Sequence, residues 1–219
     1  MKHQHSYAKL AFCFRNVAVQ ILSREDFAAW RNDAQVLERD GHGDKVLRLA
    51  DGTFLKLFRR KSWLSKTAFY SPARRFADNA AALQLLGIPC PKVIRLYRMS
   101  APYRSVVHYQ PLAGETLRHL LQKDGTLDQQ KLFIRLAEFI TQLHASGVYF
   151  RSLHMGNIVL TPSNNFGLID ISDMRCLGRP LSRRLRNRNY QHLLRYDSDW
   201  ALANPEARLL FTADTRPAL

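Results

Sequence analysis

Cysteine is scarce in this sequence of 219 residues, which has only three, Cys13, Cys90 and Cys176. Three scattered thiols form neither a disulfide framework nor a zinc site, and this indicates a reducing compartment. Long apolar runs are also missing: no stretch approaches the roughly 20 apolar residues that cross a bilayer, and the N-terminal run 10–14 is too short for the core of a signal peptide. We therefore expect a cytoplasmic protein, or one attached peripherally to the inner face of the cytoplasmic membrane.

Acidic residues are few as well: 18 Asp and Glu stand against 33 Lys and Arg, which leaves a formal net charge of +15 at pH 7. Such an excess predicts a negatively charged partner, for which nucleic acid, anionic lipid and phosphorylated glycan are all candidates. The hydrophobic share of 46% allows one sizeable core or two small lobes and argues against a disordered chain.

The positive charge is concentrated in two segments that contain no acid. Seven Lys and Arg lie in the segment 56–75, and seven Arg lie in the segment 175–196. A solvated helical face is the ordinary explanation of such a run, but the lack of interleaved acids favours a surface that binds a polyanion.

The expected elements run from a β-rich half to an α-rich half, which predicts an α+β fold. Residues 1–33 are expected to be an N-terminal extension that ends in a helix capped by Ser23. The halves themselves are expected to cover residues 34–109 and 110–219.

Apolar periodicity and turn residues locate the individual elements. Alternating residues from 36 to 60 predict a three-stranded antiparallel meander, whose second turn is Asp51-Gly52. The other predictions are a helix over 72–86, strands over 92–98 and 103–109, a short helix over 117–122, and a long helix over 128–146.

Candidate chemistry follows the long helix, where Asn157 and Asp170 lie 13 residues apart around two short apolar strands, 158–160 and 167–169. Such a hairpin places an amide oxygen beside a carboxylate, and Mg²⁺ takes a few oxygen ligands of this kind from a protein. Upstream, Lys56 is a cation in the middle of the apolar strand FLKLF. A lysine in that position can reach nucleotide phosphates.

The order of these residues resembles that of protein kinases. FLKLF stands where kinases carry the lysine of V-A-I-K. The segment FRSLHMGN, 150–157, matches the catalytic loop H-R-D-L-x-x-x-N at Arg151, Leu153 and Asn157, and Asp170 in IDIS stands at the aspartate of D-F-G.

Within that superfamily the chain is similar to the small bacterial lipopolysaccharide kinases, which phosphorylate heptose or Kdo of the inner core, and in particular to a branch called toluene-tolerance proteins. The phrases that carry this resemblance are GIPCPKVI, VVHYQPLAGETLRHLL and LHASGVYFRSLHMGNIVL. The resemblance implies a two-lobed kinase-like fold, in which a small antiparallel sheet with one main helix precedes a reduced, mostly helical lobe with a basic C-terminal segment.

The resemblance also implies ATP and Mg²⁺ as cofactors and assigns residues to them. Asn157 and Asp170 would bind the metal, and Arg151, Ser152 and His154 would form the catalytic loop. The residues placed at the nucleotide are Lys56, Gly41, Gly43, Asn79 and Tyr109.

Three features depart from the kinase pattern. Ser152 replaces the aspartate that accepts the hydroxyl proton, and Phe150 replaces the preceding histidine. Asn79 stands where an acidic residue usually pairs with the strand lysine, and the loop GHGD has only two glycines. A serine hydroxyl by itself is too weak a base for the proton. The base would then be His154, Asp173 or the substrate; otherwise the chain is a pseudokinase.

These observations predict an ATP- and Mg²⁺-dependent phosphotransferase that acts on lipopolysaccharide inner-core sugar at the inner membrane surface. The anionic glycolipid or the membrane would be bound by Arg183, Arg184, Arg186 and Arg188. The alternative is a nucleotide-binding pseudokinase that regulates or scaffolds core assembly. Nucleic acid is disfavoured as a partner, because no RNA- or DNA-binding module is recognisable.

Overall fold

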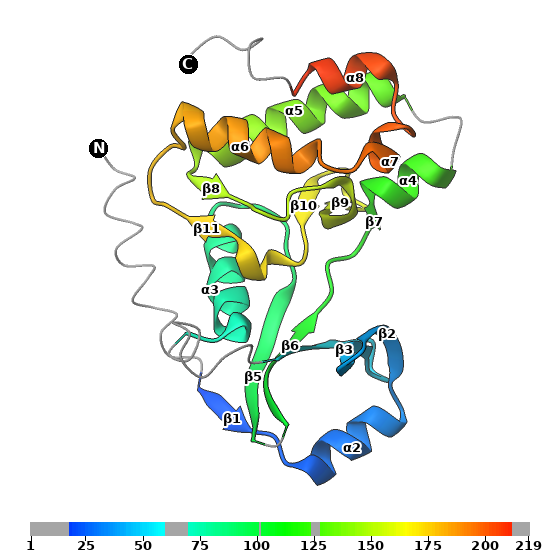
Figure 1. Ribbon diagram of the computed structural model, residues 1–219, viewed down its shortest axis with the longest axis vertical. Helices are drawn as coiled ribbons and strands as arrows, with labels where there is room; N and C mark the ends of the chain where they lie inside the picture. The colour runs from blue at the N-terminus through cyan, green and yellow to red at the C-terminus, as the bar shows by residue number, and fades with distance from the viewer. Residues whose placement is uncertain (1–17, 60–69, 101, 124–127, 212–219) are drawn as a thin grey trace. The chain divides into compact units, whose positions relative to one another are not determined.

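A computed structural model of the chain describes residues 18–59, 70–100, 102–123 and 128–211 (Figure 1). The chain forms two compact units: residues 1–84 with 90–111, and residues 85–89 with 112–219. The first is built on an antiparallel sheet and the second is mostly helical, which confirms the predicted α+β class.

The sheet of the first unit has six strands in the order β1-β5-β6-β4-β3-β2. The predicted meander is confirmed as β2 (Gln35–Asp40), β3 (Gly43–Arg48) and β4 (Phe54–Arg59). Its second turn forms at Gly52, with φ of 81°, and the Asp51 carboxylate accepts hydrogen bonds from the Thr53 N–H and hydroxyl at 2.9 and 2.6 Å. The turn residues thus fix the register of β3 and β4.

The other predicted elements of this unit are confirmed within two residues at each end. They are α3 (Pro72–Leu85), β5 (Lys92–Ser100) and β6 (Tyr103–Gln110). The helix is followed by Gly87 at φ of 68°, a left-handed conformation that glycine adopts without strain. Strand β6 lies between β4 and β5, so that Lys56 pairs with Val107.

Alternation along β4 divides the sheet into two faces. Leu55 and Leu57 point into a core cluster that also contains Leu47, Tyr97 and Val106. Lys56 lies between these two leucines and therefore points to the opposite face. Phe54 is on that opposite face as well, where α3 packs through contacts between Phe76 and Tyr109.

Part of the expected N-terminal extension belongs to the first unit. Strand β1 (Val19–Ile21) pairs in parallel with β5, and helix α2 (Arg24–Asn32) packs Phe27 and Trp30 against the leucine cluster. The predicted cap is confirmed, since the Ser23 hydroxyl accepts a hydrogen bond from the Asp26 N–H at 2.9 Å. Both elements therefore pack on the sheet of the first unit.

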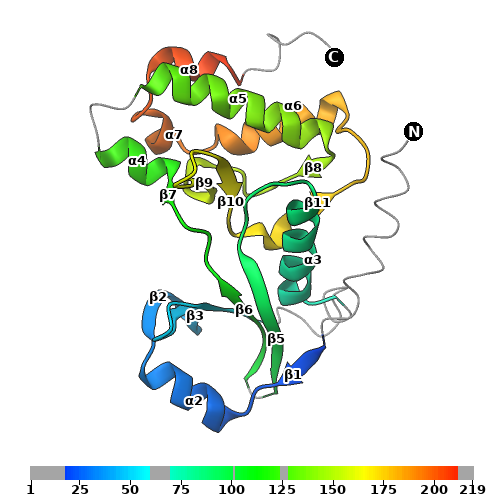
Figure 2. The same cartoon turned by 180° about the vertical axis from the view of Figure 1, so that it is seen from behind.

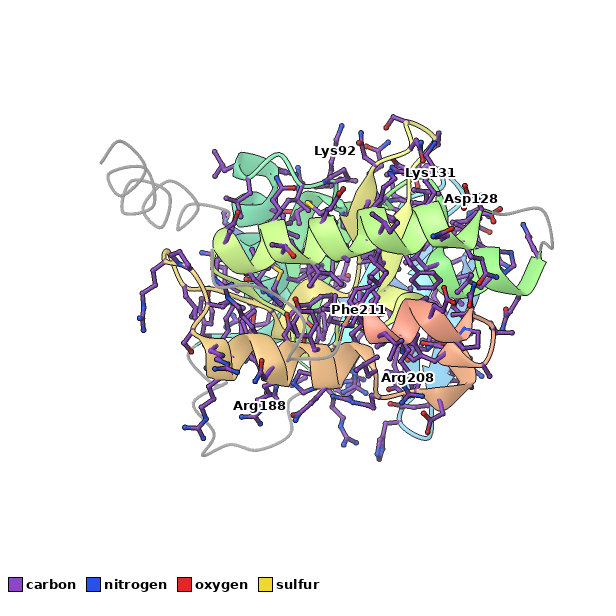
Figure 3. All side chains as sticks on the ribbon, turned by 90° about the horizontal axis from the view of Figure 1, so that it is seen from above. Lys92, Asp128, Lys131, Arg188, Arg208 and Phe211 are labelled. Atoms are coloured by element: carbon purple, nitrogen blue, oxygen red, sulfur yellow. The ribbon has the colours of Figure 1, made fainter. Side chains whose placement is uncertain are left out.

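The second unit is organised around its longest helix. Helices α4 (Leu117–Lys123) and α5 (Gln129–Ala145) confirm the predicted pair, and α6 (Arg183–Leu193), α7 (Asp197–Trp200) and α8 (Pro205–Leu209) follow. Phe211 lies between α5, α6 and α8 (Figure 3) and is fully buried against Phe133, Tyr190 and Trp200. None of the helices in the described ranges is long and apolar enough to span a membrane.

Short strands complete this unit. β7 (Glu115–Thr116), β9 (Ile158–Leu160) and β10 (Phe166–Leu168) form a three-stranded sheet beside α4 (Figure 2). The strand predicted over 158–160 is confirmed, whereas the one predicted over 167–169 begins one residue earlier. β8 (Val148–Tyr149) and β11 (Arg175–Cys176) pair as a second ribbon. Two-residue strands give no periodic signal, so sequence analysis missed them.

The packing of α2 predicts a stability effect for Trp30, whose ring meets Tyr97 edge-on at a centroid distance of 5.5 Å. Trp30→Ala should lower the free energy of unfolding by about 2–3 kcal/mol, less than for a fully buried tryptophan, because Trp30 is only partly buried. Urea unfolding followed by circular dichroism measures the change. The exposed Ala29→Ser on the same helix should change it by no more than about 0.5 kcal/mol. Equal changes in the unfolding free energy for the two variants would show that the packing of α2 on the sheet does not stabilise the first unit.

Candidate active site

The predicted metal ligands are brought together by the β9–β10 hairpin. Asn157 ends the 3₁₀ turn η3 (Met155–Asn157) just before β9, and Asp170 follows β10. The Ile169 N–H donates a hydrogen bond to the Asn157 carbonyl oxygen at 3.0 Å, which closes the 13-residue separation. The strand pairing thus holds the two residues at one end of the hairpin.

The side chains at this point are suited to a hard cation. Asn157 is buried, and its Nδ2 donates to the Ser152 carbonyl oxygen at 2.9 Å, which leaves the amide oxygen as the group that can ligate. Asp170 has φ of 52° and ψ of 44°, a left-handed conformation that is uncommon outside glycine and often found at functional sites. Among the described residues, no group of three or more His, Cys, Asp or Glu side chains could hold a metal. An amide oxygen with one carboxylate fits Mg²⁺, which keeps most of its other ligands as water and phosphate.

Ser152, at the position of the kinase aspartate, is hydrogen-bonded to a carboxylate from another turn. Its Oγ donates to Asp173 Oδ2 at 2.6 Å. Asp173 ends the 3₁₀ turn η4 (Ile171–Asp173), which follows Asp170 directly. Its second oxygen, Oδ1, is buried and has no hydrogen-bond partner among the described residues.

His154, the other candidate base of the loop, caps η3. Its Nδ1 accepts a hydrogen bond from the Gly156 N–H at 3.1 Å, so the proton of the neutral ring lies on Nε2 and no lone pair is left to accept another. The pKa of His154 lies below its ordinary value, mainly because the ring is buried and secondly because Arg118 is nearby. The ring packs edge-on against Tyr196 at 5.1 Å. This geometry favours a structural role for His154.

An ion pair between a half-exposed arginine and a buried aspartate lies beside the same loop. Arg118 of α4 donates from Nε and Nη2 to the Asp199 carboxylate at 2.5 and 2.9 Å, and the hydrogen bond to Asp199 raises the pKa of Arg118. Asp199 is only 1% exposed. A Cβ added to Gly156 would come within 2.8 Å of Arg118 Nη1, so a larger residue would have to displace the guanidinium that binds Asp199.

A buried asparagine holds the inner side of the loop. Asn189 of α6 is fully buried; its Nδ2 donates to the Phe150 carbonyl oxygen at 2.5 Å, and its Oδ1 accepts from His144 Nε2 at 3.0 Å. Phe150, which replaces the kinase histidine, is a fully buried core residue. Sequence analysis missed Asn189, Arg118 and Asp199, because no local pattern marks partners 39 to 81 residues apart.

Arg151 is exposed, whereas Phe150 and Leu153 of the same loop are buried. It lies near His192 of α6, whose pKa is lowered by burial first and then by Arg195, Arg188 and Arg151. Arginines of the catalytic loop and of α6 therefore contribute to one region of positive potential.

In the first unit, Lys56 points to the face of the sheet that α3 covers, with its Nζ 5.8 Å from the centre of the Phe58 ring. Asn79 lies on α3 and is buried. Tyr109 is also buried and packs between Phe54 and Phe76 at centroid distances of 5.7 and 5.1 Å, so its ring has a core-packing role.

Of the glycines expected at the nucleotide, Gly41 forms a two-residue turn with His42 between β2 and β3, and Gly43 is the first residue of β3. Gly41 has free space around it, whereas Gly43 has φ of 113°, which other residues rarely adopt. The turn is held by the Arg104 guanidinium, which donates to the His42 carbonyl oxygen at 3.0 Å, and by the Asp40 carboxylate, which accepts from the His42 N–H at 2.8 Å. The structure thus gives this segment the geometry of a tight β-hairpin.

The four arginines predicted to bind an anion differ in their surroundings. Arg183, Arg184 and Arg188 are exposed on α6 and line a hollow of about 490 Å³, and Arg188 lies on the side of α6 that faces away from α5 (Figure 3). Arg186 is partly buried, and its Nε donates to the Leu181 carbonyl oxygen at 2.9 Å. Arg186 therefore anchors the start of α6, and the others form the outer basic surface.

Comparison with known proteins finds a match to the family model described as the lipopolysaccharide kinase (Kdo/WaaP) family, over residues 34–210. The match covers both the strand that carries Lys56 and the hairpin with Asn157 and Asp170, and it confirms the predicted resemblance to the lipopolysaccharide kinases. A search of curated proteins finds no match.

The Arg118–Asp199 pair predicts an asymmetric response to mutation. Arg118→Leu should lower the free energy of unfolding by about 2–3 kcal/mol, because it leaves the buried Asp199 carboxylate without its charge partner. The double variant Arg118→Leu with Asp199→Leu should recover at least half of that loss, since neither charge remains buried. Urea unfolding measures both changes.

An exposed pair in the same unit is the matched control. Arg208 and Asp197 approach to 3.1 Å, but the Asp197 side chain is 85% exposed. Arg208→Leu should therefore change the unfolding free energy by no more than about 0.5 kcal/mol. A double Leu variant less stable than Arg118→Leu alone would contradict the interpretation of a buried, charge-dependent clamp.

Proposed function

Because this chain belongs to the lipopolysaccharide kinase (Kdo/WaaP) family, we propose that it is an ATP- and Mg²⁺-dependent phosphotransferase for an inner-core sugar, acting at the cytoplasmic face of the inner membrane. Family membership supports a kinase-like role in the lipopolysaccharide core. The observation that carries the proposal is the juxtaposition of Asn157 and Asp170 at the end of the β9–β10 hairpin, in the register of the kinase metal ligands.

In this proposal Asn157 and Asp170 hold Mg²⁺ through the amide oxygen and the carboxylate. When bound, the metal neutralises charge on the transferred phosphoryl group. The hydrogen bond from Asn157 Nδ2 to the Ser152 carbonyl oxygen fixes which end of the amide can face the metal. The left-handed backbone at Asp170 turns the chain directly after β10 and sets the direction of the carboxylate.

Lys56 and the β2–β3 turn would bind the nucleotide phosphates. The strand pairings of β4 on both sides hold the Lys56 backbone rigidly, so its ammonium group is confined to the α3 face. The ammonium group is a compact point charge on a flexible stem, which can neutralise the charge of an anionic ligand on that face. The backbone N–H groups of the glycine turn are the nearest counterpart of a phosphate-covering loop.

A pseudokinase that regulates or scaffolds core assembly is the second candidate function. It is favoured by two replacements, Ser152 for the loop aspartate and Asn79 for the acidic partner of the strand lysine. Phosphoryl transfer rests mainly on positioning and charge neutralisation, so neither replacement excludes turnover. Transfer of labelled phosphate from ATP to Kdo-containing inner-core lipopolysaccharide would support the kinase, and nucleotide binding without transfer would support the pseudokinase.

The acceptor and the location are further parts of the proposal. The outer basic surface of α6 has no acidic residue, and it suits phosphorylated lipid A, core sugar or the anionic leaflet. Membership of the toluene-tolerance branch is also part of the proposal, and it is supported by the segments GIPCPKVI, VVHYQPLAGETLRHLL and LHASGVYFRSLHMGNIVL.

Nucleotide binding gives the first test of the proposed function. Millimolar ATP with Mg²⁺ should raise the melting temperature, because a ligand at 100 times its Kd stabilises the folded state by about 2.7 kcal/mol. Asp170→Asn should weaken the Mg²⁺-dependent part of the shift, and Lys56→Ala should weaken the shift with or without metal. Differential scanning fluorimetry with and without EDTA measures these effects.

The matched control is Asp197→Asn, which removes an exposed carboxylate of the same unit. Its Mg²⁺-dependent shift should equal that of the wild type. The absence of any shift in the wild-type protein would refute both candidate functions, since each requires a bound nucleotide.

Lipid binding gives a separate test, for which the structure distinguishes the exposed arginines of α6 from the partly buried Arg186. Arg184→Gln with Arg188→Gln should weaken binding to liposomes that contain lipopolysaccharide by about 30-fold at low salt, because each arginine near an anionic surface contributes about 1 kcal/mol. Co-sedimentation at low and high salt measures the effect, which should fade at high salt. The nucleotide-induced melting shift should not change.

Arg186→Gln is the control, since it removes the same charge from the same helix. It should lower the melting temperature through loss of the contact with Leu181 and weaken liposome binding less than the double variant does. Equal sedimentation of the wild type and the double variant would refute the membrane-facing role. RNA bound more tightly than the liposomes at equal salt would instead favour a nucleic-acid partner.

A further inference from the structure

The hydrogen bond between Ser152 and Asp173 offers a replacement for the missing aspartate of the catalytic loop. On the premise of the proposed kinase function, we propose that Ser152 takes the proton of the acceptor hydroxyl and passes its own proton to Asp173. The contact of 2.6 Å between Ser152 Oγ and Asp173 Oδ2 carries this inference. Ser152 and Asp173 would together do what one carboxylate does in other kinases.

The geometry of Ser152 suits a relay. A hydroxyl has one proton and two lone pairs, and the proton of Ser152 is directed at Asp173. The lone pairs are therefore available to an acceptor hydroxyl that reaches the loop. His154 is not equivalent, because its Nδ1 lone pair is occupied by the Gly156 N–H.

Among the described residues, Asp173 has few partners: it accepts a hydrogen bond from Ser152, and its charge acts on His192. Its one hydrogen bond within the described chain is the one from Ser152, and no Lys or Arg there forms an ion pair with it. Its Oδ1 is buried and finds no hydrogen-bond partner in the part of the chain that the structure describes, a situation that is rare in folded proteins and calls for a reason. A role as proton acceptor during turnover would explain the buried oxygen, since a protonated carboxyl group is neutral and less costly to bury.

The register of the loop places this pair beside the metal ligands. The Ser152 carbonyl oxygen accepts from Asn157 Nδ2 at 2.9 Å, so the position of Ser152 is tied to that of Asn157. On the other side, one 3₁₀ turn joins Asp173 to Asp170. The relay is therefore built from the same two turns that carry the metal ligands.

The step balances without any further reactant. The acceptor oxygen forms a bond to the γ-phosphorus, and the bond from that phosphorus to the β,γ-bridging oxygen breaks, with its electron pair leaving on ADP. The acceptor proton moves to Ser152 Oγ while the Ser152 proton moves to Asp173 Oδ2. After the product leaves, the reverse shift returns the extra proton to solvent through Ser152.

Asp173→Asn tests this inference, because the amide oxygen can still accept the Ser152 hydrogen bond but takes up no proton at neutral pH. Transfer from ATP to Kdo-containing inner-core lipopolysaccharide should lose about 10²–10⁴-fold in kcat, the usual value of general-base catalysis, with KM for ATP unchanged. The melting shift with a non-hydrolysable ATP analogue and Mg²⁺ should equal that of the wild type. Ser152→Ala should lose at least tenfold in kcat.

The rescue variant Ser152→Asp with Asp173→Asn places the carboxylate in the loop and the amide opposite it. It should recover at least tenfold in kcat over Asp173→Asn, which a purely structural role of Asp173 does not predict. Wild-type kcat in Asp173→Asn or in Ser152→Ala would overturn the relay and leave the proposed function intact. No transfer by the wild-type protein, with the nucleotide shift retained, would instead refute the kinase function itself and the relay with it.

Discussion

The backbone hydrogen bond from Ile169 to Asn157 is the constraint on which the candidate active site depends. It extends the pairing of β9 with β10 by one step, and so fixes the loop 150–157 against the segment that carries Asp170. Both metal-ligand candidates are then positioned by backbone rather than by flexible side chains. The position of Ser152 is fixed as well, because its backbone carbonyl oxygen accepts a hydrogen bond from the Asn157 side-chain amide.

Buried polar contacts hold the loop from both sides. Asn189 of α6 satisfies the Phe150 carbonyl oxygen, and Arg118 with Asp199 closes over Gly156. A buried polar group that loses its partner is costly, so contacts of this kind favour a single loop conformation. The helices that follow the catalytic motif are therefore part of its support.

The excess positive charge has more than one use. Arg118 forms a buried pair and Arg186 anchors a helix start, whereas Arg184 and Arg188 remain on the surface of α6. Net charge alone cannot distinguish these cases, since it counts each arginine equally. Burial and hydrogen bonding separate the structural arginines from those that are free to attract an anion.

Local signals are sufficient to predict the meander, α3 and α5, which follow from periodicity and turn residues, and the motifs are sufficient to identify the family. Only the folded chain shows that β1 and α2 belong to the first unit, that Tyr109 packs in its core, and that Ser152 meets Asp173. The reason is physical: periodicity and capping act over a few residues, whereas a contact between side chains 21 or 81 residues apart exists only once the intervening chain has folded.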